Sequence, residues 1–319
     1  MIPTLRRYGT LAGVLLAILF FWAALPGTFM TARNWLNISQ QMSMLAAVAF
    51  TMTVVMAMGD FDLSAGAMAS LAGIAAALLF RDTGSIAAGV AGALALGLLG
   101  GLINGVLVSY LAMLPFVATL GTMTIFGGLA FLLSGGKTLF GSDIPAGFSN
   151  FARGGIPLSS AGDQVLLLPN LTLAAAAVLF LVYLLLEQTV FGRRLYAIGG
   201  NREAARLAGV QVQRLRFAAF GISGLGAAAA GLMYASRVAS ANPVQGSGLM
   251  LDAIAAVFLG MTMSEEGEPR VLHTLAGVLI LGVLGNGLTQ MNVDSYIRQV
   301  LTGMIILAAV ASGSIGKTR

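Results

Sequence analysis

The sequence contains no cysteine and only one histidine, His273. The lack of cysteine excludes disulfides, thiolate catalysis and thiolate metal sites. One histidine cannot supply a zinc or haem site, and the chain has no Ser, His and carboxylate set and no paired-carboxylate site. We therefore expect no catalytic site, no metal and no cofactor in this chain.

Charge is also scarce, because 9% of the residues are charged against about 25% in an ordinary soluble domain. With 58% hydrophobic residues and a mean hydropathy of +0.91, the composition predicts an integral membrane protein whose solvent is lipid. A net charge of +5 would suggest a nucleic-acid partner in a soluble protein. Here the arginines cluster at the ends of apolar runs, where they set membrane topology, so no nucleic-acid partner is expected.

The apolar runs predict a single transmembrane domain over residues 1–319, an all-α polytopic protein with about ten spans. The predicted spans cover about 9–29, 38–58, a third that ends near residue 80, 86–110, a fifth from 115, then 171–186, 217–235, 249–263, 271–290 and 294–311. The first run has the alternative of a signal peptide, but its length favours a retained span. The polar stretch 135–170 predicts an external loop with a short surface helix, and 236–248 a second external segment.

Glycine spacing predicts where two of these spans approach other helices. Gly97, Gly101 and Gly105 recur every four residues in the fourth span, and the seventh span is also rich in glycine. Small residues allow membrane helices to pack closely. Both spans should therefore contact neighbouring helices with little side-chain volume between them.

The distribution of basic residues predicts the orientation. With both termini in the cytoplasm, ten spans place eleven of the seventeen Lys and Arg residues inside and six outside. This bias agrees with the positive-inside rule, and the opposite orientation would reverse it.

A basic interruption over 191–216, FGRRLYAIGGNREAARLAGVQVQRLR, separates two apolar stretches and holds six arginines. Asn201 is suited to cap a helix, Glu203 to its positive end and Gly209 to the position after it. The pattern predicts a helix of about two turns over 202–208, too short to be stable alone. Its small apolar stripe, Ala204, Leu207 and Ala208, favours a helix that fits into a groove of another protein, and the alternative is an ordinary charged cytoplasmic loop.

Polar residues in the apolar stretches are candidates for a translocation pathway. They are Asp62, Ser64, Gly66, Thr119, Thr122, Asp252 and Asn286. Simple helix capping is the alternative for Asp62 and Ser64, and hydrogen bonding to the threonine's own helix is the alternative for Thr119 and Thr122. The stretch from Asp62 faintly resembles LDAIAAVFLG at 251–260, which suggests an inverted repeat unless the likeness is due to chance.

The acidic stretch SEEGEPR at 264–270 has two interpretations. Its glutamates, Glu265, Glu266 and Glu268, either remain solvated in a turn or meet cations. The candidate cations are Arg193, Arg194 and Arg206 of the basic interruption, or a basic patch on a partner protein. The C-terminal GSIGKT imitates a phosphate-binding loop, but it lacks the first glycine of that motif and a following helix, so we expect no nucleotide site.

Four stretches together resemble the permease subunits of ribose-type sugar ABC importers: GDFDLSAG, PFVATLGTMTIFGGLAFLLSGGKT, the basic interruption and LDAIAAVFLG. The resemblance covers roughly residues 46–309. It implies a ten-span inverted-repeat fold in the bacterial cytoplasmic (inner) membrane and a pathway for a monosaccharide. It also implies a second permease copy, identical or similar, a cytoplasmic ATP-binding cassette ATPase and an external sugar-binding protein. The chain itself would not be an enzyme, since ATP hydrolysis is on a partner.

The resemblance also implies a role for the interruption as the cytoplasmic coupling loop, with its short helix docked in a cleft of the ATPase. The implied docking residues are Asn201, Arg202, Glu203, Ala204, Ala205, Leu207 and Gly209. Two departures from the family pattern are the acidic stretch and Asp60, where a glycine is usual. The alternative function is an ion-coupled secondary transporter or channel that works without an ATPase. The position of the titratable residues near span ends weakens that alternative.

Overall fold

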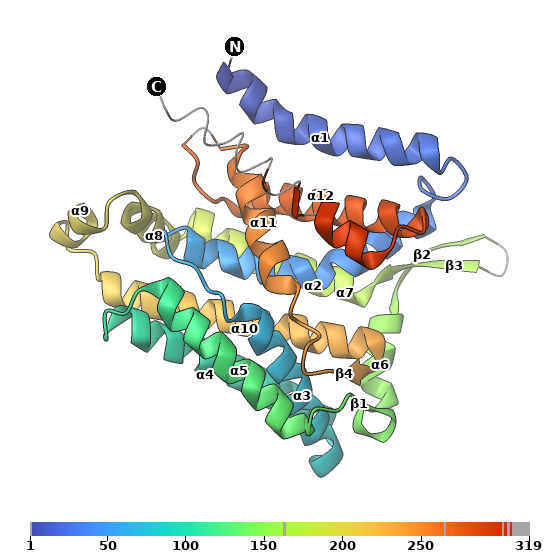
Figure 1. Ribbon diagram of the computed structural model, residues 1–319, viewed down its shortest axis with the longest axis horizontal. Coiled ribbons are helices and arrows are strands. Elements are labelled where there is room, and N and C mark those ends of the chain that lie inside the picture. Colours follow the sequence, from blue (N-terminus) through green and yellow to red (C-terminus); the bar gives the residue numbers. More distant parts are fainter. Residues whose placement is uncertain (1, 162–163, 265, 302, 305–306, 308–319) are drawn as a thin grey trace.

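The computed structural model describes residues 2–161, 164–264, 266–301, 303–304 and 307. These residues form a bundle of helices with two small two-stranded sheets (Figure 1), which confirms the all-α membrane class. In chain order the elements are α1 (Ile2–Ala24), α2 (Ala32–Met56), α3 (Ala65–Thr83), α4 (Ile86–Ser109), α5 (Pro115–Ser134), β1 (Leu139–Phe140), a 3-10 turn (Gly141–Asp143), α6 (Ala146–Arg153), β2 (Gly155–Ala161), β3 (Gln164–Pro169), α7 (Asn170–Tyr183), a π-helical turn (Leu184–Gln188), α8 (Val190–Gly200), α9 (Arg202–Leu207), α10 (Val212–Val238), β4 (Ser240–Ala241), α11 (Leu249–Met261) and α12 (Val271–Gln290).

Within this part of the chain, seven helices are long and apolar enough to cross a membrane. They are α2, α3, α4, α5, α7 with its π-helical turn, α10 and α12, while α1 and α11 contribute shorter apolar stretches. The expected last span, 294–311, lies partly outside the described residues, and the GSIGKT stretch, 313–318, lies entirely outside them. The count of about ten spans and the inverted repeat therefore stay predictions.

Helix α10 lies at the centre of the bundle, packed against α2, α3 and α4. A Cβ atom added at Gly97 or at Gly101 of α4 would lie 2.5 Å from the carbonyl oxygen of Gly224 and 2.2 Å from that of Phe220, respectively. Because these are backbone atoms, no side chain could move aside. The glycine-lined contact predicted from the sequence is confirmed, with α10 as the partner of α4.

Two opposite ends of the bundle carry different elements (Figure 1). Helices α8 and α9 extend from one end, called here the α9 end, and α6 with the hairpin β2–β3 lies at the other, called the hairpin end. The predicted surface helix of 135–170 is α6, whose carbonyl at Phe148 accepts a hydrogen bond from the Ser236 hydroxyl near the end of α10. The hairpin was not expected from the sequence.

Helix α10 begins at Val212, five residues before the predicted seventh span, so the last arginines of the basic interruption are helical. Its C-terminal residue, Val238, is followed by β4, which pairs with β1 near the hairpin end. The predicted external segment 236–248 is only partly at that end, because residues 245–246 turn back and contact α3.

Candidate functional site

The short helix of the basic interruption is present as α9. The side chain of Asn201 accepts a hydrogen bond from the backbone N–H of Ala204, so it caps the helix as its sequence position predicts. Gly209 has a φ of +82°, a left-handed conformation that glycine adopts without strain. The helix ends at Leu207, one residue earlier than expected.

The apolar surface of α9 faces outward. Leu207 is 77% exposed, Ala204 and Ala208 are also exposed, and Ala205 is the buried residue that seats the helix on the bundle. Glu203 receives two hydrogen bonds from the guanidinium of Arg206, which lower the pKa of its carboxyl group. A large apolar side chain is therefore held in solvent on a capped and locally rigid turn.

A buried carboxylate connects α9 to the bundle. Asp60, in the turn between α2 and α3, is 2% exposed and receives Arg202 of α9 on one oxygen at 3.0 Å. Its other oxygen receives Arg216 of α10 at 2.7 Å, and Arg216 also donates to the carbonyl of Val108 in α4. Asp60, where the resemblance leads one to expect a glycine, thus joins the short helix to α10 directly and to α4 through Arg216.

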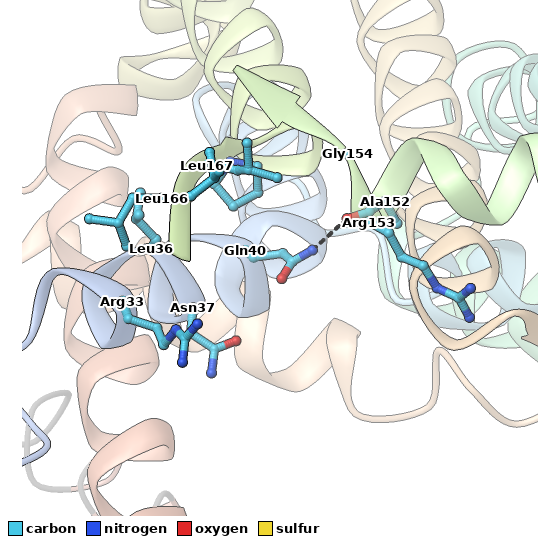
Figure 2. A pocket seen from close by; sticks show the side chains of 11 residues that line it. Arg33, Leu36, Asn37, Gln40, Ala152, Arg153, Gly154, Leu166 and Leu167 are labelled. Atoms are coloured by element: carbon cyan, nitrogen blue, oxygen red, sulfur yellow. Dashed lines mark hydrogen bonds between the residues drawn. The ribbon is translucent and has the colours of Figure 1, made fainter. Parts of the chain in front are cut away.

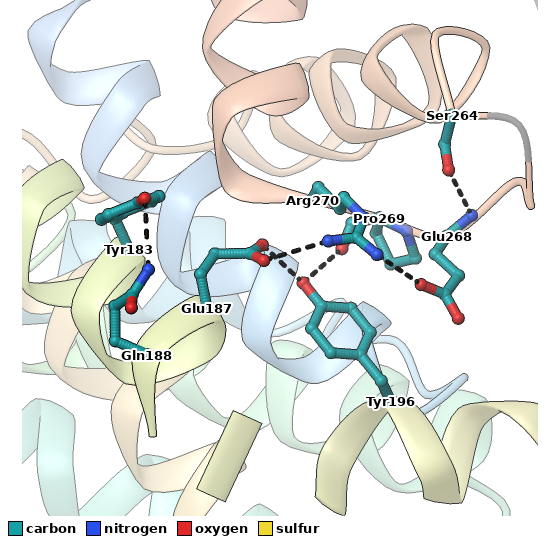
Figure 3. Close-up of polar contacts among 8 residues, drawn as sticks. All are labelled: Tyr183, Glu187, Gln188, Tyr196, Ser264, Glu268, Pro269 and Arg270. Carbon is teal, nitrogen blue, oxygen red and sulfur yellow. Dashed lines mark hydrogen bonds and ion pairs between the residues drawn. The ribbon is translucent and has the colours of Figure 1, made fainter. Parts of the chain in front are cut away.

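A second polar cluster holds α8 against the acidic stretch (Figure 3). Arg270 donates to Glu187 at 3.1 Å and to Glu268 at 3.3 Å, and its guanidinium carbon lies 5.6 Å from the ring centroid of Tyr196. The Tyr196 hydroxyl lies at hydrogen-bond distance from both Glu187 and the carbonyl of Pro269. Burial raises the pKa of the Tyr196 hydroxyl and that of the Glu268 carboxyl. The cluster ties the end of α7, α8 and the start of α12 together.

The cluster shows that Glu268 of the acidic stretch does meet a cation, but not one of the arginines expected from the sequence. The ion-pair partner of Glu268 is Arg270, two residues away, and neither Glu266 nor Glu268 pairs with Arg193, Arg194 or Arg206 in the described part of the chain. Arg270 lies closer in the sequence than those three arginines, and its ion pair with Glu187 holds it in place. Glu265 lies outside the described residues.

The predicted pathway residues near the start of α3 form a buried hydrogen-bonded chain. Asp62 accepts bonds from the backbone N–H and hydroxyl of Ser64 on one oxygen and from the Ser223 hydroxyl on the other. Asn104 of α4 donates to the Ser64 hydroxyl at 2.8 Å and accepts from the Thr122 hydroxyl of α5 at 2.6 Å. This hydrogen-bonded network joins α10, α3, α4 and α5, and each side chain in it is at most 3% exposed.

Asn104 and Ser223 were missed by sequence reasoning. A lone amide in an otherwise apolar span, as at Asn104, is a signal that can identify such a residue, because an unpaired amide in hydrocarbon is costly. Ser223 has no comparable signal. It lies among glycines and alanines, and a serine in such a stretch is common and does not stand out in the sequence.

Of the other predicted pathway residues, Thr119 contacts this hydrogen-bonded network through its carbonyl, which accepts a bond from the Thr122 hydroxyl at 3.2 Å. Thr119 is buried and bonds to the carbonyl of Pro115 in its own helix, as the alternative interpretation expected. Asn286 of α12 is buried and accepts a bond from Gln290. Asp252 is half-buried in the first turn of α11. Gly66 is buried against Gly246. The pathway role of all seven residues predicted from the sequence stays a prediction.

A pocket of about 340 Å³ lies at the hairpin end (Figure 2). Its polar lining comes from the start of α2, with Arg33, Asn37 and Gln40, and from Arg153 at the end of α6. Gln40 donates to the carbonyl of Ala152 at 2.6 Å, which holds α6 against α2. Sequence reasoning did not find this pocket, because it forms between segments more than a hundred residues apart.

No group of three or more His, Asp or Glu side chains that could hold a metal ion occurs among the described residues. The polar clusters consist of ion pairs and hydrogen bonds that join helices to one another. What the geometry offers is a helical bundle with a rigid, exposed apolar turn at one end and a polar pocket at the other.

Comparisons with known proteins identify the family. The family described as "Branched-chain amino acid transport system / permease component" matches residues 34–310. The ribose import permease protein of Bacillus subtilis (strain 168) is 37% identical over 316 residues, which cover 96% of this chain and 92% of that protein. The ribose import permease protein of Escherichia coli (strain K12) is 35% identical over 96% of this chain and 95% of its own length.

The L-arabinose transport system permease protein of Escherichia coli (strain K12) is 37% identical over 95% of this chain and 89% of that protein. No solved structure matches the chain significantly. Because one family covers most of the sequence and similar permeases match it nearly from end to end, the chain belongs to the permease components of branched-chain amino acid-type transport systems.

Proposed function

We propose that this chain is the membrane permease of an ABC importer and forms the translocation pathway for a monosaccharide. The observation that carries the proposal is the exposed turn α9, a capped helix on which the Leu207 side chain is 77% exposed. An exposed leucine on a rigid turn is suited to fit a groove of a partner. A cytoplasmic ATP-binding cassette ATPase is the partner, and Asn201, Arg202, Glu203, Ala204, Ala205 and Gly209 shape the docked turn.

The α9 end then faces the cytoplasm, and the hairpin end faces the external sugar-binding protein. This orientation places the basic interruption inside, as the positive-inside rule requires, and both termini are cytoplasmic. A second permease copy, identical or similar, completes the pathway. Lipid covers the apolar faces that remain exposed on α4, α5 and α7.

A monosaccharide is the favoured substrate, because the ribose and arabinose permeases match nearly the full chain. The family description favours a second candidate, a branched-chain amino acid. Uptake assays separate the two: vesicles containing the permease with its ATPase and binding protein are supplied with labelled ribose, arabinose or leucine. Import of leucine but of neither sugar would contradict the sugar assignment. Uptake by the permease alone, driven by an ion gradient, would instead support a secondary transporter or channel.

The docking role of α9 is tested with Leu207→Asp. Burying an uncharged polar group without a partner costs about 2–7 kcal/mol and a carboxylate costs more, so ATPase affinity should fall by at least about tenfold. The ATPase activity stimulated by loaded binding protein should fall with it. Leu207→Met is the matched control, since it keeps an apolar side chain of similar size and should behave as the parent. Normal stimulation in Leu207→Asp would refute the assignment.

A further inference from the structure

The chain between α10 and α11 turns back into the bundle. The backbone N–H of Gly246 donates to the hydroxyl of Ser70 in α3 at 2.9 Å. A Cβ atom added at Gly66 would lie 2.5 Å from the carbonyl oxygen of Gly246, and one added at Gly73 would lie 2.4 Å from the amide nitrogen of Gln245. The segment 242–248 therefore runs along the first turns of α3 in direct contact with its backbone.

The contact with Ser70 shows how deep the segment lies. Arg81 and Asp82 form an exposed ion pair near the end of α3 and mark where that helix leaves the apolar layer. Ser70 is eleven residues before Arg81, which corresponds to about 16 Å along a helix that rises 1.5 Å per residue. The hydrocarbon layer is about 30 Å thick. Gly246 thus lies near the middle of the membrane.

Part of this segment is open at that depth. Ser247 and Gly248 are exposed, and the side chains of Val244 and Leu251 on either side are 50% and 59% exposed. The backbone here is not yet helical, since α11 begins at Leu249. The Ser247 hydroxyl makes no hydrogen bond within the described part of the chain. The backbone N–H of Ser247 donates to the carbonyl of Val244 and that of Gly246 donates to Ser70, so the exposed group that lacks a partner is the Ser247 hydroxyl. A hydroxyl without a hydrogen bond is costly in lipid, which favours a position against a water-filled cavity.

We propose that 242–248 is a re-entrant segment that lines a water-filled pathway and presents Ser247 and Gly248 to the transported sugar. The proposal rests on the function proposed above and gives its pathway particular residues. The segment carries no charged side chain, and its exposed side chains are the apolar Val244 and the hydroxyl of Ser247, a combination that suits a neutral ligand rich in hydroxyl groups. Asp252 lies in the first turn of α11, and its backbone N–H donates to the carbonyl of Gly248.

The same geometry relates the segment to the residues predicted from the sequence. Gly66 lies directly behind Gly246, so it supports the lining from the side of α3. Asn242 donates to the Thr138 hydroxyl at 2.7 Å, and β4 pairs with β1, which together fix the segment to the chain that follows α5. The lining is therefore held from both the hairpin end and the interior of the bundle.

The test uses the absence of native cysteine. Ser247→Cys is placed in the full chain, which is reconstituted with its ATPase and binding protein, and a membrane-impermeant charged thiol reagent is added. The matched control is Leu181→Cys, an apolar position of α7 that is 63% exposed and lies near the middle of a span. We expect Ser247→Cys to react at least ten times faster than the control, and saturating ribose or arabinose, whichever is imported, to slow its labelling.

A second variant gives an independent result. Ser247→Trp should narrow the path and lower sugar uptake at least tenfold, while the complex with the ATPase is recovered in the same yield as with the parent. Equal labelling of the two cysteine variants or normal uptake by Ser247→Trp would overturn the inference. Failure of the parent permease to import any sugar would instead contradict the proposed function, so the two failures are distinguishable.

Discussion

The strongest energetic prediction concerns Asp60, which receives arginines from two helices in different surroundings. The side chain of Arg216 is 9% exposed and that of Arg202 is 48% exposed, while Asp60 itself is 2% exposed. Breaking a buried ion pair leaves an uncompensated charge and costs about 3–5 kcal/mol, whereas a solvent-screened pair contributes about 0.2–1 kcal/mol. Breaking the pair of Asp60 with Arg216 should therefore lower the free energy of unfolding far more than breaking its pair with Arg202.

We expect Asp60→Asn to destabilise the permease by about 3–5 kcal/mol, because the buried Arg216 then has only neutral oxygens near it and no counter-charge. Arg202→Gln should cost no more than about 1 kcal/mol. The double variant Asp60→Asn with Arg216→Gln should be more stable than the sum of the two single changes predicts, since neither charge is left buried alone. Asp82→Asn, which breaks an exposed pair in α3, is the control and should leave the stability unchanged.

The assay is thermal unfolding of the purified permease in detergent, followed by the fraction that remains monodisperse. Equal losses for Arg202→Gln and Asp60→Asn, or full additivity of the double variant, would refute the reasoning from burial. Arg202→Gln also has a functional readout. Because it removes one of the contacts that hold α9 on the bundle without removing the exposed Leu207, the ATPase should still bind while the sugar imported per ATP falls.

Two further predictions follow from backbone contacts and from the cluster around Arg270. Gly224→Ala should destabilise the bundle by about 1–3 kcal/mol, because its Cβ atom would lie 2.1 Å from the carbonyl oxygen of Gly97. Gly121→Ala is the matched control in the same thermal assay, since a Cβ atom there meets no atom within 4 Å. Tyr196→Phe removes the hydroxyl that contacts Glu187 and Pro269 but keeps the ring beside Arg270, so it should cost about 1 kcal/mol, and Arg270→Gln should cost more because it leaves Glu187 without its cation. A larger loss for Tyr196→Phe than for Arg270→Gln would contradict this order.

Much of the local structure was predictable from sequence because it depends on neighbouring residues. Asn201 and Gly209 bracket a helix since a side-chain oxygen and a left-handed residue act within one turn. The glycines of α4 predicted a close helix contact because their spacing places them on one face. The membrane class followed from composition, since a chain with so few charges cannot cover a soluble surface.

Contacts between distant residues could not be predicted in the same way. Asp60 and Arg216 are 156 residues apart, and only the packing of α10 beside the turn after α2 brings them together. Several arginines could have paired with the acidic stretch. Glu268 pairs with Arg270, which Glu187 also binds, and the sequence does not show that Glu187 lies close to it.

The sequence by itself determined where the apolar helices lie, where the short capped turn begins and which class of solvent surrounds the chain, because these depend on hydrophobic runs and local capping. Only the tertiary structure decided that Asp62, Ser64, Asn104 and Thr122 share one buried chain and that 242–248 re-enters the bundle. The physical reason is that an apolar run carries no information on which neighbours it will have. In a membrane the pairing of helices is selected by close packing and hydrogen bonds between surfaces, and these form only when the whole bundle is assembled.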